Sequence, residues 1–140
     1  MCQKRGGVYY TDFLNPLEMQ EAVKSIRELE GLKYQGYGGY EGAERKLLAI
    51  YPDDMEEEEL IFPIKAMRVT NKFSKLRHPD ILGAILGMGL KREKIGDILA
   101  WEYQGDVIGY KETIDFLLLF LEKVGKNRVS PMEISFDELK

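Results

Sequence analysis

The chain has 140 residues, of which 44% are hydrophobic and 31% are charged, a composition typical of one globular protein and not of a disordered one. The net charge is −4, and the single cysteine, Cys2, excludes an internal disulfide and a cysteine-based metal site. The longest apolar run, residues 81–90, is much shorter than the ~20 residues that span a bilayer. We therefore expect a cytoplasmic protein without membrane contact.

The first part of the chain predicts a small subdomain over residues 11–59. Residues 1–10 show no periodicity, and we interpret them as a tail or linker. A helix is predicted after Asn15, because Asn15 and Glu18 form a capping-box pattern, and Gly31 is its predicted stop. Two strands around a glycine-rich turn follow, and the acidic run 53–59 is either a loop or the first turn of a short helix.

The remainder, residues 60–140, predicts an α+β domain. The expected elements are a strand at 60–70, a helix at 79–89, a hairpin at 94–110 turning near Gly105, a helix at 111–125 and a strand at 127–136. This β-α-β-β-α-β order is that of the ferredoxin-like fold, which RNA-recognition motifs (RRMs) share, so we predict an RRM-like domain. Pro131 indicates an edge strand or a bulge.

Aromatic residues are scarce on the strands that we expect at the centre of this sheet. We place the strands 60–70 and 127–136 there, and their only aromatic residues are Phe62 and Phe136. RRMs stack bases on aromatic side chains of the sheet. The usual stacking face is therefore poorly supplied in this chain.

Charge is distributed unevenly along the sequence. Residues 53–59 hold six acids and no base, whereas residues 65–94 hold eight bases and only two acids. Because salt screens each charge beyond about 10 Å, a local surplus matters more to a polyanionic partner than the net charge does. A solvated basic face without a partner is the alternative interpretation.

The segment GMGLKREKIGDI places three of these bases, Lys91, Arg92 and Lys94, directly after a glycine-rich helix. Gly83 and Gly87 are four residues apart on one helix face, where they predict the close approach of another backbone. One base beyond the helix end would complement the helix dipole, and three exceed that need. We interpret the basic cluster as a candidate phosphate-binding loop.

A second candidate set lies in GYGGYEGAERK. Tyr37 and Tyr40 offer flat faces for unpaired bases, and Arg45 and Lys46 offer phosphate contacts, although ordinary packing of the tyrosines is an equal alternative. The segment lacks the pattern of a nucleotide-binding P-loop. The lone histidine, His78, precedes a proline at a helix start, a place where histidine is more often a structural residue than a catalytic one.

Three stretches, TDFLNPLE (11–18), GGYEGAERK (38–46) and HPDILGAILGMGLKREKIGDI (78–98), resemble the bacterial YlmH family in order and spacing. The resemblance implies an RNA-binding protein linked to cell division, whose C-terminal αL-type RNA-binding domain would begin where this chain ends. It also implies association with the large ribosomal subunit and rescue of stalled translation, with ribosomal RNA or tRNA as partner. The family usually has His-Arg-Asp at 78–80, so Pro79 replaces one base here.

The motif match carries over a set of residues without saying which of them touch RNA: Gly38, Gly39, Glu41, Gly42, Arg45, Lys91, Arg92 and Lys94. Our first hypothesis is a non-catalytic RNA-binding module, without cofactor, metal or small-molecule substrate. Its predicted RNA contacts are Lys91, Arg92, Lys94, Arg45, Lys46, Tyr37, Tyr40 and His78.

Two alternatives stay open at this stage. The first is a protein-interaction domain that docks to a ribosomal or division protein through the acidic run or a sheet edge. The second is an RNA-processing enzyme that uses His78 and Asp80 as an acid–base pair, although no nucleophile or second histidine accompanies them at a recognisable spacing.

Overall fold

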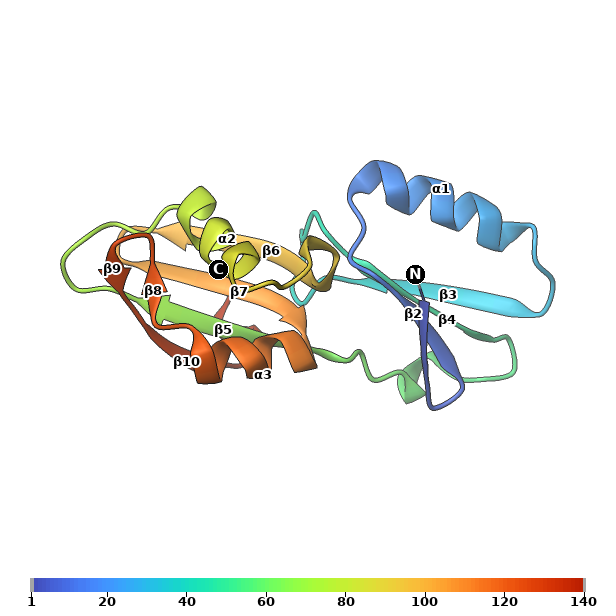
Figure 1. Ribbon diagram of the computed structural model, residues 1–140. Coiled ribbons are helices and arrows are strands. Elements are labelled where there is room, and N and C mark those ends of the chain that lie inside the picture. Colours follow the sequence, from blue (N-terminus) through green and yellow to red (C-terminus); the bar gives the residue numbers. More distant parts are fainter. Residues whose placement is uncertain (1, 140) are drawn as a thin grey trace. The chain divides into compact units, whose positions relative to one another are not determined.

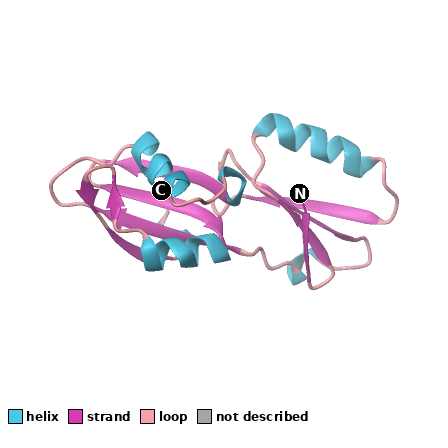
Figure 2. Cartoon of the chain, viewed as in Figure 1, coloured by secondary structure: helices cyan, strands magenta, loops and turns pink. Residues whose placement is uncertain are grey.

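The computed structural model describes residues 2–139, which fold into two compact units, unit 1 (Met1–Phe62) and unit 2 (Pro63–Lys140). Both units combine helices with antiparallel strands (Figure 1, Figure 2), and this confirms the predicted mixture of α and β structure. The units divide after residue 62, whereas the sequence placed the division after residue 59.

Unit 1 is built on an antiparallel sheet with the strand order β1-β2-β4-β3. Its strands are β1 (Cys2–Arg5), β2 (Val8–Thr11), β3 (Leu32–Tyr37) and β4 (Leu47–Pro52). The interpretation of residues 1–10 as a tail or linker is therefore wrong for residues 2–10, and residue 1 lies outside the described part. Gly6 and Gly7 form the two-residue turn of the β1–β2 hairpin with φ angles of 58° and 82°, the left-handed backbone that such turns require.

Helix α1 (Pro16–Arg27) begins as the sequence predicts. The Asn15 side chain accepts a hydrogen bond from the Glu18 amide at 2.8 Å, and the Glu18 carboxylate accepts one from the Asn15 amide at 3.0 Å. The helix ends before the predicted stop, and Gly31 instead adopts a φ of 79° in the turn into β3. The predicted hairpin is confirmed, because β3 pairs with β4 along its whole length.

The last residues of unit 1 pack back onto its sheet. The Tyr10 hydroxyl donates to the Ile61 carbonyl at 2.8 Å. The Phe62 ring lies 5.9 Å from the Tyr10 ring and 5.2 Å from the Tyr37 ring, between ring centroids. The predicted strand at 60–70 starts only at Ile64, because the Ile61 carbonyl and the Phe62 ring contact unit 1 instead. Part of the acidic run forms a one-turn 3₁₀ helix, Glu57–Glu59.

Unit 2 contains a second antiparallel sheet, with the strand order β10-β5-β7-β6 (Figure 1). Its elements are β5 (Ile64–Thr70), α2 (His78–Gly87), β6 (Ile95–Trp101), β7 (Gln104–Tyr110), α3 (Lys111–Phe120) and β10 (Ser130–Ile134). The central strands are β5 and β7, so the placement of 127–136 at the centre is wrong. β10 is an edge strand, as Pro131 predicts.

A short hairpin, β8 (Lys123–Val124) and β9 (Asn127–Arg128), stands between α3 and β10. The sequence predicts a continuous helix to Gly125, but α3 ends at Phe120. Leu121 and Val124 are buried as the helical pattern requires, yet they reach the core from extended backbone. Gly125 forms the hairpin turn with a φ of 61°.

One face of the unit 2 sheet packs against both helices. The apolar core there joins residues of β5, β6, β7, α2 and α3, including Met67, Ile81, Ile98, Val107 and Ile114. Gly105 on β7 gives α2 room, because a Cβ at this position would overlap with the Ile81 side chain. Gly83 and Gly87, by contrast, face open space, so the close backbone approach predicted for them is wrong.

Candidate functional site

The predicted basic cluster lies in unit 2, in the 3₁₀ turn Arg92–Lys94 that leads into β6. The Arg92 guanidinium donates through Nη1 to the Ile95 carbonyl at 2.8 Å and to the Gly96 carbonyl at 3.2 Å. The Lys94 ammonium lies 5.0 Å from the centroid of the Tyr110 ring, in a cation–π contact. Both side chains thus have structural partners within unit 2, whereas Lys91 is exposed at the start of the turn.

The predicted residues of unit 1 lie on or beside the β3–β4 connection. The Tyr37 hydroxyl donates to the Gly39 carbonyl at 3.0 Å, and its half-buried ring packs on Phe62. Arg45 donates through Nη2 to the Phe13 carbonyl at 3.1 Å. Lys46 pairs through its backbone with Leu14. Each of these three residues therefore helps to hold the connection in place.

Glycine is required at several positions of this connection for steric and conformational reasons. A Cβ at Gly38 would overlap with the Ala43 side chain and lie 2.7 Å from the Arg45 carbonyl oxygen. Gly39 and Gly42 adopt φ angles of 96° and 88°. Tyr40 is half-buried at the tip, and its carbonyl accepts from the Ala43 amide at 3.4 Å. The glycine-rich motif thus builds a tightly closed turn.

His78 is exposed at the first position of α2, where Arg77 is the capping residue and Pro79 follows. Within residues 2–139, the structure contains no hydrogen bond between His78 and Asp80. The same part of the chain contains no cluster of three or more His, Cys, Asp or Glu side chains suited to a metal ion. Nor does it contain a helix that is long and apolar enough to cross a membrane.

The sheet face of unit 2 opposite the helices carries an ion pair. Arg68 on β5 and Asp106 on β7 are directly paired in register, and their neighbours Met67 and Val107 enter the helix-side core. The Arg68 guanidinium bonds both carboxylate oxygens of Asp106 and also donates to the Glu138 carbonyl at 3.0 Å. The hydrogen bond with Asp106 raises the pKa of Arg68 above its usual value. The C-terminal 3₁₀ turn Phe136–Glu138 therefore lies against this face.

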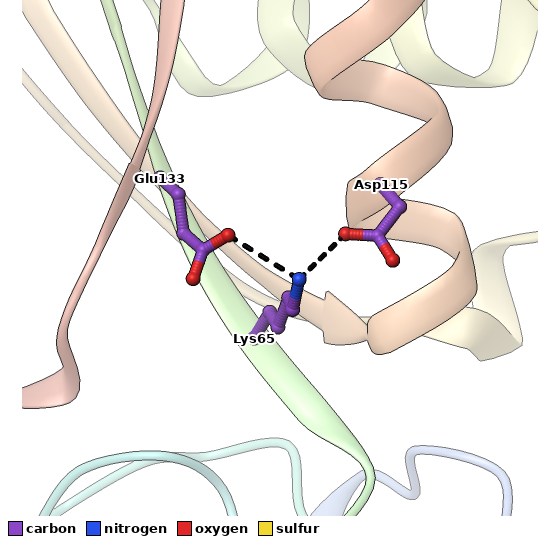
Figure 3. A network of polar contacts seen from close by, with 3 residues as sticks. All are labelled: Lys65, Asp115 and Glu133. Atoms are coloured by element: carbon purple, nitrogen blue, oxygen red, sulfur yellow. Dashed lines mark hydrogen bonds and ion pairs between the residues drawn. The ribbon is translucent and has the colours of Figure 1, made fainter.

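A second polar network stands at the edge of the helix side (Figure 3). The Lys65 ammonium contacts Asp115 of α3 at 2.7 Å and Glu133 of β10 at 3.3 Å. It joins three elements that are far apart in the sequence. The sequence offers no signal for this network, because the spacing of the three residues follows no local period.

Sequence reasoning counted the bases of the loop 71–77 but missed that they lie beside those of the β8–β9 hairpin. The loop 71–77 carries Lys72, Lys75 and Arg77, and the β8–β9 hairpin carries Lys123, Lys126 and Arg128. Residues of both segments line one pocket of about 320 Å³. Phe73, with 89% of its surface exposed, stands in this pocket wall. The sequence signal was the aromatic residue among bases in NKFSKLR.

Two family models match nearly the whole chain in succession. The model described as "YlmH, N-terminal" matches residues 2–55, and the model described as "Putative RNA-binding domain in YlmH" matches residues 56–138. A relative from Bacillus subtilis (strain 168), named "Ribosome-associated protein quality control protein P2", is 36% identical over 141 residues. The match covers 99% of this chain and 54% of the relative, so the chain spans about half the length of that protein.

A solved structure shares the fold. It is the "Cell division protein ylmH from Streptococcus pneumoniae", with a TM-score of 0.80 and 24% sequence identity, over 94% of this chain and 81% of that one. Together with the two family models, which cover residues 2–138, this likeness agrees with the resemblance seen in the sequence motifs. The chain therefore belongs to the YlmH family.

Proposed function

We propose that this chain is a non-catalytic RNA-binding module that acts on ribosomal RNA or tRNA at the large ribosomal subunit, in cytoplasmic translation quality control. The observation that carries the proposal is the surplus of bases in residues 65–94, within the part matched by the model of the RNA-binding domain. The name of the Bacillus relative supports the ribosomal partner. A link to cell division rests on family membership alone.

We also propose that unit 2 is an RRM-like domain. The strand order β10-β5-β7-β6, with both helices in one core, supports this assignment. The opposite face holds the Arg68–Asp106 ion pair, and the C-terminal turn lies against it. RNA binding on the loops of unit 2 therefore agrees better with the geometry than binding on the sheet.

Substitution of Lys91 is the most direct test of the predicted phosphate contacts. Arg92 and Lys94 have internal partners, so their substitution would disturb the turn as well as the charge. The supporting residues in this proposal are Arg45, Lys46, Tyr37, Tyr40 and His78. A phosphate contact contributes roughly −0.7 to −0.9 to the slope of log affinity against log salt concentration.

The experiment is co-sedimentation of the chain with purified large ribosomal subunits at two salt concentrations. We expect salt-sensitive pelleting of the wild type and weaker pelleting of Lys91→Glu. Lys24→Glu is the matched control, because Lys24 is also exposed and the charge change is the same. Absence of wild-type pelleting at low salt would overturn the ribosomal proposal, and equal pelleting of both variants would remove Lys91 from the interface.

A protein-interaction domain that docks to a ribosomal or division protein is the second candidate. The specific observation is an apolar patch on α3, where Leu119 is 77% and Phe120 is 58% exposed and the Phe116 ring lies 4.8 Å from the Phe120 ring. Exposed apolar patches mark protein contacts. Subunit binding that survives high salt and added RNA, but is lost in Leu119→Ser, would favour this candidate.

A further inference from the structure

The loop 71–77 lies on the surface and is joined to neighbouring segments by several hydrogen bonds. Asn71 is 8% exposed, and its side-chain oxygen accepts hydrogen bonds from the Phe73 and Ser74 amides, both at 2.8 Å. Its side-chain nitrogen donates to the Arg128 carbonyl at 2.7 Å. One buried amide therefore shapes the loop and ties it to the β8–β9 hairpin.

The β6–β7 turn fixes the same loop from another side. The Asn71 amide donates to the Tyr103 carbonyl at 2.9 Å, and the Leu76 amide donates to the Glu102 carbonyl at 2.8 Å. The Leu76 side chain is buried in the core of unit 2. Phe73 is thus presented by an anchored loop, and a second exposed aromatic residue, Tyr103, lies on the turn that anchors it.

The two segments that line the pocket beside Phe73 carry positive charges only. The loop 71–77 holds three bases and no acid, and the segment 123–128 holds three bases and no acid. The adjoining acids are Glu102 in the β6–β7 turn and Glu122 before β8. Within residues 2–139, the side chains of Lys72, Lys126 and Arg128 make no hydrogen bond or ion pair with another residue. Their charges are therefore available to an anionic ligand.

We propose that this surface is a binding site for single-stranded RNA, in which an unpaired base stacks on Phe73 and the flanking phosphates contact Lys72, Lys126 and Arg128. This inference rests on the proposed function and gives it a second, distinct site. An aromatic face among bases is the arrangement that single-strand recognition uses. The pocket beside Phe73 has a volume of about 320 Å³, within the size range of small-ligand sites. A pocket of this size can hold a nucleotide.

The surface around Phe73 is a better candidate for RNA binding than the predicted basic cluster of Lys91, Arg92 and Lys94, because fewer of its basic side chains have partners within the protein. Arg92 donates hydrogen bonds to carbonyl groups of its own unit, and Lys94 makes a cation–π contact there. The side chains of the bases around Phe73 have no such partners among the described residues. A double-stranded RNA offers no unpaired base to Phe73. The proposal therefore predicts a preference for single strands that depends on this side chain.

The test is a fluorescence anisotropy titration of the full chain with a labelled single-stranded RNA of about 12 nucleotides, within the usual range of site sizes. We expect Phe73→Ala to weaken binding about 10-fold or more and Phe73→Tyr to bind as the wild type does, because a base stacks equally on either ring. Leu17→Ala is the control, since it removes a large exposed apolar side chain on α1, outside every proposed site. Circular dichroism checks that each variant is folded.

The phosphate contact is tested with Lys126→Glu, and Lys111→Glu is the control at an exposed position of the same unit. Lys126→Glu should weaken binding and reduce the salt slope by about 1, and Lys111→Glu should leave the slope unchanged. A duplex of the same sequence should bind Phe73→Ala and the wild type equally.

The outcomes separate this site from the proposed function. Salt-sensitive RNA binding by the wild type that Phe73→Ala and Lys126→Glu leave unchanged would overturn the site and leave the proposed function standing. No RNA binding by the wild type at low salt would overturn both. Displacement of the RNA by an oligoglutamate peptide at equal concentration, with the same dependence on Phe73, would assign the surface to an acidic protein segment instead.

Discussion

Arg68 and Asp106 form a two-bond ion pair across the central strands of unit 2, with Nε–Oδ1 and Nη2–Oδ2 distances of 2.9 and 3.2 Å. The Asp106 side chain is fully buried, and that of Arg68 is 22% exposed. Arg68 also reaches the backbone of the C-terminal turn. The pair therefore links both central strands to the last described segment of the chain.

Removing one partner of this pair should be strongly destabilising. We expect Asp106→Ala to lower the free energy of unfolding by about 3 kcal/mol, because it leaves the Arg68 charge without its carboxylate. The double variant Arg68→Met, Asp106→Leu should recover most of that loss. Urea unfolding followed by circular dichroism measures both, and an unfolding midpoint of Asp106→Ala equal to that of the wild type would contradict the expectation.

Replacing Gly38 and Gly83 by alanine should change the stability of the protein in opposite directions. Gly38→Ala should destabilise unit 1 by about 2 kcal/mol, because the new Cβ overlaps with Ala43 and the Arg45 carbonyl in a closed turn. Gly83→Ala should stabilise unit 2 by about 0.5–1 kcal/mol, because it adds a methyl group in open space within a helix. Thermal unfolding of the two variants measures the signs. A gain in stability for Gly38→Ala would refute the steric account.

Asn71→Ala should loosen the loop that carries Phe73. It removes three hydrogen bonds of a buried side chain, and we expect a loss of about 2 kcal/mol in stability. Amide hydrogen exchange should accelerate at Phe73 and Ser74, whose donors lose their acceptor. Ser74→Ala is the control, because it leaves these bonds in place. Unchanged exchange at both amides in Asn71→Ala would show that something else shapes the loop.

The Lys65 network predicts a stability change at alkaline pH. The hydrogen bond with Asp115 raises the pKa of Lys65, Glu133 acts in the same direction, and burial opposes them. The folded state thus favours the protonated amine. This contribution is complete below the ordinary pKa of 10.5 and disappears as the pH rises through the raised pKa of the folded protein.

The measurement compares wild type with Lys65→Met in urea at about pH 7 and about pH 11.5. The difference in unfolding free energy should be present at the lower pH and shrink at the higher one. Lys111→Met provides the baseline, because Lys111 has an exposed side chain. A difference for Lys65→Met that stays constant over this range would rule out the titration of Lys65 as its cause.

Local signals in the sequence predicted local structure well. Asn15 and Glu18 predicted the start of α1 correctly, because a capping box depends only on residues close in the sequence. The end of α3 was missed, because Leu121 and Val124 occupy apolar positions in a helix and are buried equally well from an extended chain. The β1–β2 hairpin was missed because its strands are too short to show a period, although the Gly6-Gly7 pair marks its turn.

The candidate site was harder to read, because charge alone does not reveal the partner of each base. Lys91, Arg92 and Lys94 look alike in the sequence, yet Arg92 closes its own turn and Lys94 covers Tyr110. Lys72 and Arg128 are far apart in the sequence, and the pairing of Ser130 with Thr70 and the Asn71–Arg128 hydrogen bond bring their segments together. Partners that depend on tertiary contacts leave no spacing to recognise.

The packing of Phe62 decides how the protein can be dissected. A fragment cut at the border of the two family models, between residues 55 and 56, would carry Phe62 away from the Tyr10 and Tyr37 rings. The truncated N-terminal piece would lose the acceptor of its Tyr10 hydroxyl, and the other piece would gain an uncovered phenyl ring. Cleavage after residue 62 keeps this aromatic cluster whole, so separate expression of the two halves should start from that bond.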